Sequence, residues 1–325
     1  MAWRVFVLDI EKQELVPRQT ATLPPPPGPE DGRVVWIDLE SPSQAELREI
    51  GRLYGLHPLA LEDCLHDGQR PKLESYDGHV FLVIHHPRFD NAKYSAILNE
   101  VDLFLGHKFV ITSHQGPLPF LDVVHERWED SEETRSAGAA FLAYLIADTL
   151  VDDYFPVLDN LEDMLSDIDD KVFSEPENSR VLGLTAALKK QIVKLRRYVG
   201  PTRDAFVWLV RHESPLLSRN AIVHFQDVYD HLIRISDTLD LYRDLAGGVQ
   251  ETYLTLVANR TNTSMKKLTA FTITLMCVTL VSSIYGMNFQ HMPELAWKHG
   301  YLAALGLMAG VGGLSLGVFK LRGYF

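Results

Sequence analysis

Cysteine is nearly missing from this 325-residue sequence, which contains only Cys64 and Cys277. Two cysteines so far apart cannot build a disulfide framework or a Cys-based zinc site within one chain. Basic residues are also scarce, because 31 Lys and Arg stand against 43 Asp and Glu for a net charge of -12. Nucleic acid, which attracts basic surfaces, is therefore not expected as a partner, and cations are favoured.

Enzyme motifs are missing as well. The sequence has no glycine-rich phosphate loop, nucleophile elbow or paired catalytic motif. Its 13 histidines are scattered without the spacing of a zinc site. We therefore do not expect an enzyme. A signal peptide is not expected either, since Arg4 and Asp9 interrupt the short apolar start, so the soluble part should be cytoplasmic.

Charge is absent from two long apolar runs near the C-terminus. The first, residues 268–285, follows two lysines, and the second, residues 301–319, precedes Lys320 and Arg322. Each run is long enough to cross a hydrocarbon core of about 30 Å as a helix. The positions of the basic residues predict cytoplasmic termini and an external loop. We expect a multi-pass protein of the cell (inner) membrane, in contact with lipid.

Proline is absent from the 73 residues 216–288, and only Gly247-Gly248 interrupts good helix formers there. A continuous helix of that length would span roughly 110 Å, of which a bilayer takes about 30 Å. The remainder is predicted to be a cytoplasmic stalk. A helix that long with polar and apolar faces needs partners, so we expect an oligomer.

The N-terminal part is predicted to be an α/β domain. Apolar β-rich stretches predict strands at residues 3–8, 34–39, 79–85, 97–105 and 109–113. Helices are predicted at residues 43–54 and 58–66, with Ser41 or Ser43 as the N-cap.

A helical region with unusual charge follows. Residues 148–180 contain 11 Asp and Glu against two Lys and Arg. A solvated helical face is the plainer interpretation, and an acidic collar that concentrates cations is the functional one. The basic helix at 182–198 is expected to pack against this acidic region. The predicted domains are 1–140 (α/β), 141–215 (cytoplasmic helices), 216–267 (stalk), 268–288 (first membrane helix), 289–300 (external loop), 301–319 (second membrane helix) and 320–325 (cytoplasmic tail).

One face of the first membrane helix lacks bulky aliphatic residues. Steps of three and four residues connect small, hydroxylated and thioether side chains into one stripe: Asn262, Met265, Thr269, Thr272, Met276, Thr279, Ser283 and Gly286. Hydrogen bonding between membrane helices would explain such residues. The stripe is unbroken and continues to Glu251, however, so symmetric copies around an axis could line a narrow neutral pore. The glycine pairs Gly306/Gly310 and Gly313/Gly317 predict helix packing and place the second run outside this pore.

Five segments together carry a family resemblance. Residues 285–289 contain Gly-Met-Asn between the two apolar runs, and residues 292–295 read Met-Pro-Glu-Leu. Residues 56–63, 69–72 and 227–231 extend the likeness toward the N-terminus. In this arrangement the chain resembles the CorA family of divalent-cation channels. The resemblance implies a funnel-shaped homopentamer with an α/β cytoplasmic domain, a long stalk-and-pore helix and Mg2+ influx.

The resemblance also implies roles for particular residues. Gly286, Met287 and Asn288 match the selectivity motif, and Glu251 matches an acidic ring. Asp63 and Asp227, with Glu62 nearby, match a regulatory Mg2+ site between subunits. Asn262, Met265, Met276 and Thr279 match pore-lining positions, with Met265 and Leu268 near a hydrophobic constriction. The stripe adds Thr269, Thr272 and Ser283 to the predicted pore lining. Gln290 and His291 depart from the family, where Glu often follows the motif, so the outer mouth is less acidic here.

The chemistry of the stripe suits a hydrated dication. Mg2+ releases its octahedral water shell reluctantly, and neutral oxygens at Gly286 and Asn288 could accept hydrogen bonds from that shell. Carboxylates would bind more tightly and hinder release. Co2+ and Ni2+ carry similar shells and are not separated from Mg2+ by the sequence. The alternatives are a zinc-transporting relative, which would usually have Val at Met287, and a membrane-anchored cation sensor that conducts nothing.

Overall fold

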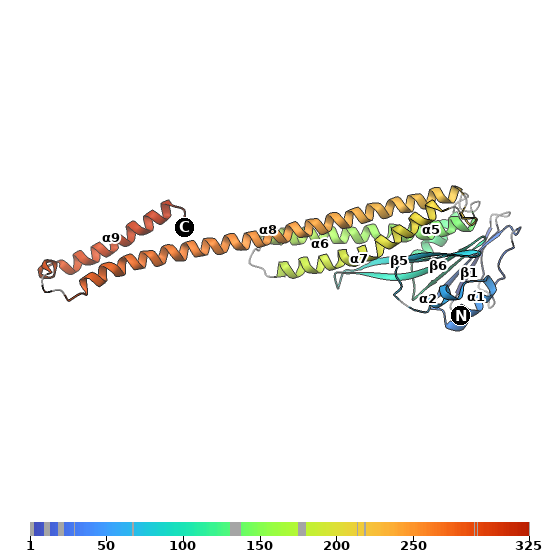
Figure 1. The fold of residues 1–325 in the computed structure, drawn as a ribbon, viewed down its shortest axis with the longest axis horizontal. Helices are drawn as coiled ribbons and strands as arrows, with labels where there is room; N and C mark the ends of the chain where they lie inside the picture. The colour runs from blue at the N-terminus through green and yellow to red at the C-terminus, as the bar shows by residue number, and fades with distance from the viewer. Residues whose placement is uncertain are drawn as a thin grey trace. The chain divides into compact units, whose positions relative to one another are not determined.

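The computed structural model describes residues 3–9, 14–18, 23–28, 30–66, 68–130, 138–174, 180–212, 214–217, 219–288, 290 and 292–324. The chain divides into two compact units. One is Met1–Asp170 with Arg180–Gly248, and the other is Lys171–Ser179 with Val249–Phe325. Figure 1 shows the helices and strands of both.

A mixed sheet forms the base of the first unit. Its order is β2-β1-β3-β7-β6-β5-β4, with β3 and β7 parallel and the other neighbours antiparallel. The strands are β1 (Trp3–Asp9), β2 (Glu14–Arg18), β3 (Arg33–Glu40), β4 (Lys72–Tyr76), β5 (His79–Asp90), β6 (Ser95–Gly106) and β7 (Phe109–His114). The five predicted strands are confirmed. The two edge strands β2 and β4 were missed, because β2 contains Pro17 and β4 is only partly buried, so neither has an apolar alternation.

Helices α1 (Gln44–Tyr54) and α2 (Pro58–Asp63) cover one face of this sheet. Ser43, not Ser41, is the N-cap of α1, and a capping box joins it to Glu46. Gly55 ends α1 with a φ of 68°, a conformation that glycine adopts without strain. Residues of both helices, such as Leu47 and Ala60, share a core with alternate sheet residues. α2 ends at Asp63, three residues before the predicted end.

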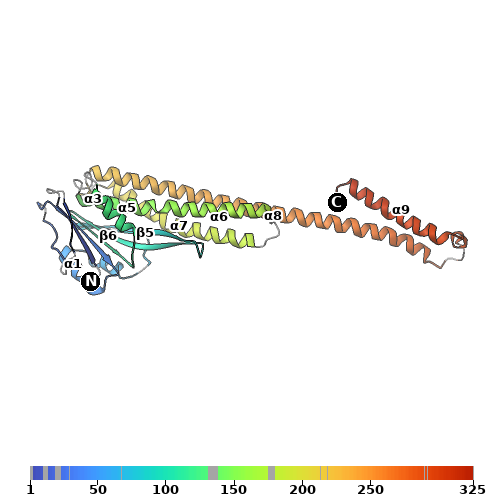
Figure 2. The ribbon, with the colours of Figure 1, turned by 180° about the vertical axis from the view of Figure 1, so that it is seen from behind.

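Helices α3 (Phe120–Asp130) and α5 (Gly138–Asp152) cover the opposite face. Trp36 on β3 meets Trp128 on α3 edge to face, with ring centroids 6.1 Å apart. α5 is buried from Ala139 to Val151 except at Tyr144, which explains its nearly uniform apolar composition. Figure 2, the reverse view, likewise places α1 across the strands from α3 and α5.

Three long helices follow in the chain: α6 (Tyr154–Ser174), α7 (Arg180–Arg211) and α8 (Arg219–Tyr285). α8 is a single helix of 67 residues, so the predicted long helix is confirmed. Tyr242 on α8 donates a hydrogen bond to Glu162 on α6. The packing of the basic helix, which is part of α7, against the acidic region stays a prediction. Two charged side chains of α7 have partners on other elements. Arg196 pairs with Asp240 on α8, and Lys194 donates to the Ala96 carbonyl on β6.

The second unit contains the C-terminal part of α8, the 3-10 turn η1 (Pro293–Ala296) and α9 (Gly300–Leu321). α8 and α9 are long and apolar enough to cross a membrane by length and composition. Thr274 and Ser315 join them through hydroxyls 3.0 Å apart. The close contact is made by Gly312, where an added Cβ would lie 3.3 Å from Val278 Cγ2. The four glycines predicted to pack, 306, 310, 313 and 317, have open space around them in this chain.

Candidate pore and cation-binding sites

The predicted pore stripe lies on the face of α8 that α9 leaves uncovered. Ala270 and Thr274 are the buried positions of this part of α8, and they face α9. The stripe residues lie on the opposite side of the helix, about 180° away at 100° per residue. All are exposed in the single chain, namely Asn262, Met265, Thr269, Thr272, Met276, Thr279 and Ser283, and so is Leu268, the further predicted pore-lining residue.

Two threonines of this face have their hydroxyl hydrogens engaged within the helix. Thr272 donates to the Leu268 carbonyl and Thr279 to the Leu275 carbonyl, both at 2.8 Å. A hydroxyl that donates backward in this way keeps its oxygen lone pairs available to accept hydrogen bonds. The face therefore offers acceptors to groups that carry hydrogens, such as the water shell of a cation.

The Gly-Met-Asn segment begins where α8 ends. The amide of Gly286 donates to the Ser282 carbonyl at 3.1 Å, and Met287 donates to Ile284 at 3.2 Å. Gly286, Met287 and Asn288 are all exposed. An added Cβ at Gly286 would make only ordinary contacts of 3.5 Å or more, so packing within one chain does not require glycine there. Phe289 and His291 lie outside the described residues.

Charge along this part of α8 is confined to its N-terminal side. Glu251, the predicted acidic ring residue, is exposed. No residue between Lys267 and Gln290 carries a charge. A cation on the stripe would therefore meet neutral oxygens and thioethers through the apolar run.

Asp63, a predicted regulatory ligand, has a cationic partner within its own chain. Its Oδ2 lies 2.7 Å from the Nζ of Lys72 on β4, and the Asp63 side chain is 22% exposed. Glu62, the neighbouring candidate, is exposed. A carboxylate on α2 is thus held against the edge of the sheet.

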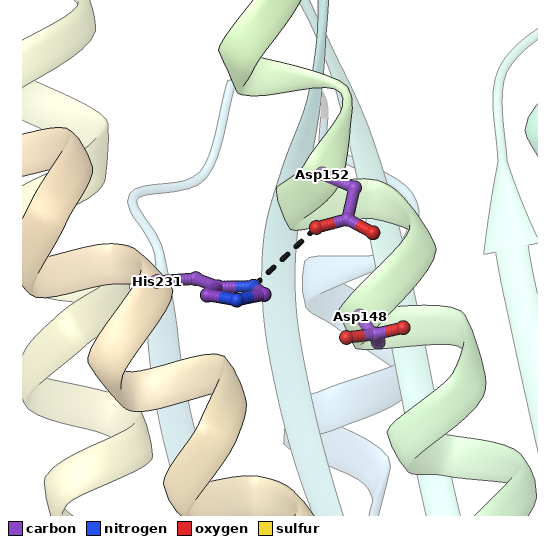
Figure 3. Close-up of side chains that lie close together, drawn as sticks. All are labelled: Asp148, Asp152 and His231. Carbon is purple, nitrogen blue, oxygen red and sulfur yellow. Dashed lines mark ion pairs between the residues drawn. The ribbon is translucent and has the colours of Figure 1, made fainter.

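Asp227, the other predicted regulatory ligand, lies on α8 with 58% of its side chain exposed. One turn further on, His231 contacts α5, where its Nδ1 lies 3.3 Å from Asp152 Oδ1. Asp148, Asp152 and His231 together place one ligand atom each within 4.8 Å of the others (Figure 3). Among the described residues this is the group whose geometry suits a metal ion.

Negative charge in this group is compensated only in part by Arg127 and His231. Burial and the neighbouring charge of Asp148 raise the pKa of Asp152, against the opposing effect of His231. Asp148 is itself buried and pairs with Arg127 at 3.0 Å. Carboxylate oxygens fit Mg2+, whereas imidazole is a better ligand for Co2+ or Ni2+. The group therefore suits a borderline transition metal at least as well as Mg2+.

This cluster was not predicted from the sequence. Of the two interpretations left open for the acidic region, a solvated face and a collar that concentrates cations, the first is wrong for Asp148, since that residue is 4% exposed. A signal was present, because Asp148/Asp152 and Asp227/His231 are both spaced by one helical turn. What the spacing could not show is that α5 and α8 lie against each other, as the ring contact between Tyr144 and His224 shows.

Asp63 and Asp227 do not belong to one cluster within the chain. α2 packs on the sheet face opposite α5, and Asp227 is one turn from a histidine that contacts α5. Figure 1 shows α2 and α8 separated by the strands. A cation shared by these two carboxylates would have to join two copies of the chain.

Comparison with known proteins, like the apolar hairpin and its exposed stripe, indicates a membrane transporter of cations. The model of a family described as CorA-like Mg2+ transporter protein matches residues 31–321. The chain belongs to the CorA family. The cobalt/magnesium transport protein CorA of Thermotoga maritima is 35% identical over 287 residues, covering 88% of this chain and 82% of that protein.

Solved structures share the CorA fold seen here. The CorA magnesium transporter of Methanocaldococcus jannaschii superposes with a TM-score of 0.84 at 22% identity, covering 100% of this chain and 99% of that one. The ZntB cytoplasmic domain of Vibrio parahaemolyticus has a TM-score of 0.61 at 16% identity, covering 80% of this chain and 100% of that one. At such identities the likeness concerns the fold alone. As a CorA-family member, the chain is a membrane transporter and not an enzyme.

Proposed function

We propose that this chain assembles into a funnel-shaped homopentamer that conducts hydrated divalent cations, chiefly Mg2+, into the cytoplasm. The observation that carries the proposal is the uncovered polar face of α8, opposite the face that α9 covers. Two helices of one subunit cannot enclose a pore, whereas symmetric copies of this face can. Co2+ and Ni2+, which hold similar water shells, are expected to pass as well.

Neutral oxygens account for conduction without dehydration. The outward lone pairs of Thr272 and Thr279 can accept hydrogen bonds from the water shell. We assign Gly286, Met287 and Asn288 to the outer mouth, where a carbonyl and an amide oxygen would do the same. Because no carboxylate lines the apolar run, the ion is bound weakly enough to leave.

The membrane potential supplies the driving force. A dication crossing a potential of 100 mV, inside negative, gains about 4.6 kcal/mol, at about 2.3 kcal/mol for each charge. The lysines before residue 268 and the basic residues after residue 319 favour cytoplasmic termini in the inner membrane. Entry then requires no nucleotide.

Internal Mg2+ is proposed to close the channel. The Asp63 carboxylate of one subunit and Asp227 of the next would share the ion, with Glu62 nearby. The separation of these residues across the sheet within one chain supports a site between copies. When internal Mg2+ falls, the carboxylates repel each other, the stalk helices loosen and the Glu251 ring opens the path.

Liposomes that contain the purified protein test both parts of this proposal. A fluorescent Mg2+ indicator inside them should report uptake that grows with an inside-negative potential, and Asn288→Ala should reduce it at least tenfold. Asp227→Ala should leave uptake intact but weaken inhibition by Mg2+ on the cytoplasmic side. Impermeable vesicles would establish the alternative of a cation sensor. Uptake of Zn2+ in preference to Mg2+ would establish the zinc-transporting alternative, against which Met287 argues.

A further inference from the structure

Lys72 forms an ion pair with Asp63, the carboxylate that we proposed above as a regulatory Mg2+ ligand. Its Nζ lies 2.7 Å from Asp63 Oδ2 and 2.9 Å from Glu74 Oε1. The same ammonium group lies 5.9 Å from the centroid of the Phe81 ring, within the range of a cation–π contact. A positive charge of the chain itself is therefore held at Asp63.

The ammonium group of Lys72 contacts two carboxylates at the same time, those of Asp63 and Glu74. Glu74 is fixed by the Tyr76 hydroxyl, which donates to its other oxygen at 2.6 Å. The side chains of Lys72, Asp63 and Glu74 are 30%, 22% and 36% exposed, so water screens the contacts only in part. If Lys72 leaves Asp63, it still has Glu74 and Phe81 as partners.

Two cations cannot share this carboxylate without repulsion. Lys72 contacts Oδ2 of Asp63, one of the two oxygens that a Mg2+ ion could bind directly or through its water shell. A bound Mg2+ ion is therefore repelled by the ammonium group or displaces it toward Glu74, and either effect weakens the binding of Mg2+.

We propose that Lys72 is a built-in competitor for Asp63 that sets the Mg2+ concentration at which the regulatory site fills. The inference rests on the proposed function, because it takes Asp63 as a regulatory ligand. Glu74 is the alternative partner that receives Lys72 when Mg2+ binds. Lys72 and Glu74 together thus raise the Mg2+ concentration at which the regulatory site is half filled above the value that its carboxylates alone would give.

Two substitutions should shift the Mg2+ response in opposite directions. Lys72→Met removes the competitor and should lower the half-maximal Mg2+ concentration about three- to fivefold, the range of a partly exposed ion pair. Glu74→Gln removes the alternative partner and one negative charge, and it should raise that concentration. A general loss of stability would move both variants the same way, so opposite shifts separate competition from a structural role.

The full-length protein in lipid nanodiscs provides a readout that is independent of transport. Protection from limited trypsin cleavage is measured against Mg2+ concentration for each variant. Lys93→Met is the matched control, because Lys93 is 79% exposed and its nearest carboxylate, on Asp90, is 3.8 Å away. The control should keep the wild-type midpoint. An unchanged or raised midpoint in Lys72→Met, or a lowered one in Glu74→Gln, would overturn the inference.

The Asp63→Asn variant distinguishes failure of this inference from failure of the regulatory proposal. If wild-type protection depends on Mg2+ and Asp63→Asn weakens it, the regulatory site stands, and the Lys72 variants decide the inference alone. If the wild type shows no Mg2+-dependent protection, or Asp63→Asn behaves like the wild type, both proposals are overturned.

Discussion

One buried carboxylate of the first unit, that of Asp38, has three side-chain partners. One oxygen accepts hydrogen bonds from Thr112 at 2.6 Å and from His114 at 3.1 Å. The other accepts from Arg4 at 2.8 Å. Burial alone would raise the pKa of Asp38, but the hydrogen bonds and the charge of His114 outweigh it, so the pKa is lowered. Ionised Asp38 therefore stabilises the joint between β1, β3 and β7.

The pH dependence of stability follows from this lowered pKa. A carboxylate whose folded pKa lies below its unfolded value of 3.8 stabilises the fold above that value. This contribution is lost as the pH falls through the folded pKa. Asp38→Asn should lower the free energy of unfolding at neutral pH by about 3–5 kcal/mol, because it leaves buried donors and charge unpaired. Thermal unfolding of the detergent-solubilised protein across pH measures both effects.

Asp122 is the matched control for Asp38. It also pairs with Arg4, but 63% of its side chain is exposed. Asp122→Asn should therefore cost less than about 1 kcal/mol. Equal losses in the two variants would contradict the role given to burial.

At the scale of elements, the packing of α8 against α9 depends on a glycine that spacing did not single out. The predicted pairs Gly306/Gly310 and Gly313/Gly317 follow the small-xxx-small rule, yet they face away from α8. Gly312 makes the contact instead. The rule identifies glycines that permit close approach, but which side of a helix is approached depends on the partner helix.

Substitution at this contact should separate the two helices. Gly312→Ile places a branched side chain where a Cβ is already 3.3 Å from Val278, and should cost about 1–3 kcal/mol through overpacking. Gly310→Ile, where nothing lies within 4 Å, is the matched control and should cost less. Thermal stability of the detergent-solubilised chain, followed by the intrinsic fluorescence of its tryptophans, compares the two. The assignment is wrong if Gly310→Ile is the more damaging change.

At the scale of the whole molecule, the two faces of α8 have separate tasks in our proposal. The face with Thr274, whose hydroxyl contacts Ser315 on α9, holds the hairpin together. The face with Thr272 and Thr279 is left for other copies of the chain and for the ion. Conduction is then a property of the assembly, although each subunit contributes the same stripe.

The same substitution on the two faces should have different consequences. Thr279→Val removes an outward oxygen and should reduce Mg2+ uptake several-fold with little change in stability. Thr274→Val removes the hydrogen bond to Ser315, at a cost of about 1 kcal/mol, and should leave uptake per folded channel unchanged. Uptake in liposomes and thermal unfolding of the same preparations test the pair. The reverse result would place the pore on the other face of α8.

Local features of this protein were determined by the sequence itself. The two uncharged runs, the long proline-free helix and the start of α1 near Ser41 or Ser43 depend on residues close together in the chain, and the membrane thickness is a fixed external length. These features could be predicted because no distant partner takes part in them. The stripe on α8 was predictable for the same reason, since one helix repeats every 3.6 residues.

Tertiary structure decided the contacts that involve distant residues. Lys72 at Asp63, Asp148 beside His231, Gly312 against Val278 and the exposure of the stripe opposite α9 all join segments whose relative placement depends on packing. Residue type cannot settle these contacts, because an acidic side chain looks the same in sequence whether it faces water, a lysine or another carboxylate. The burial of the side chain and its neighbouring groups decide whether it is ionised and what it can bind.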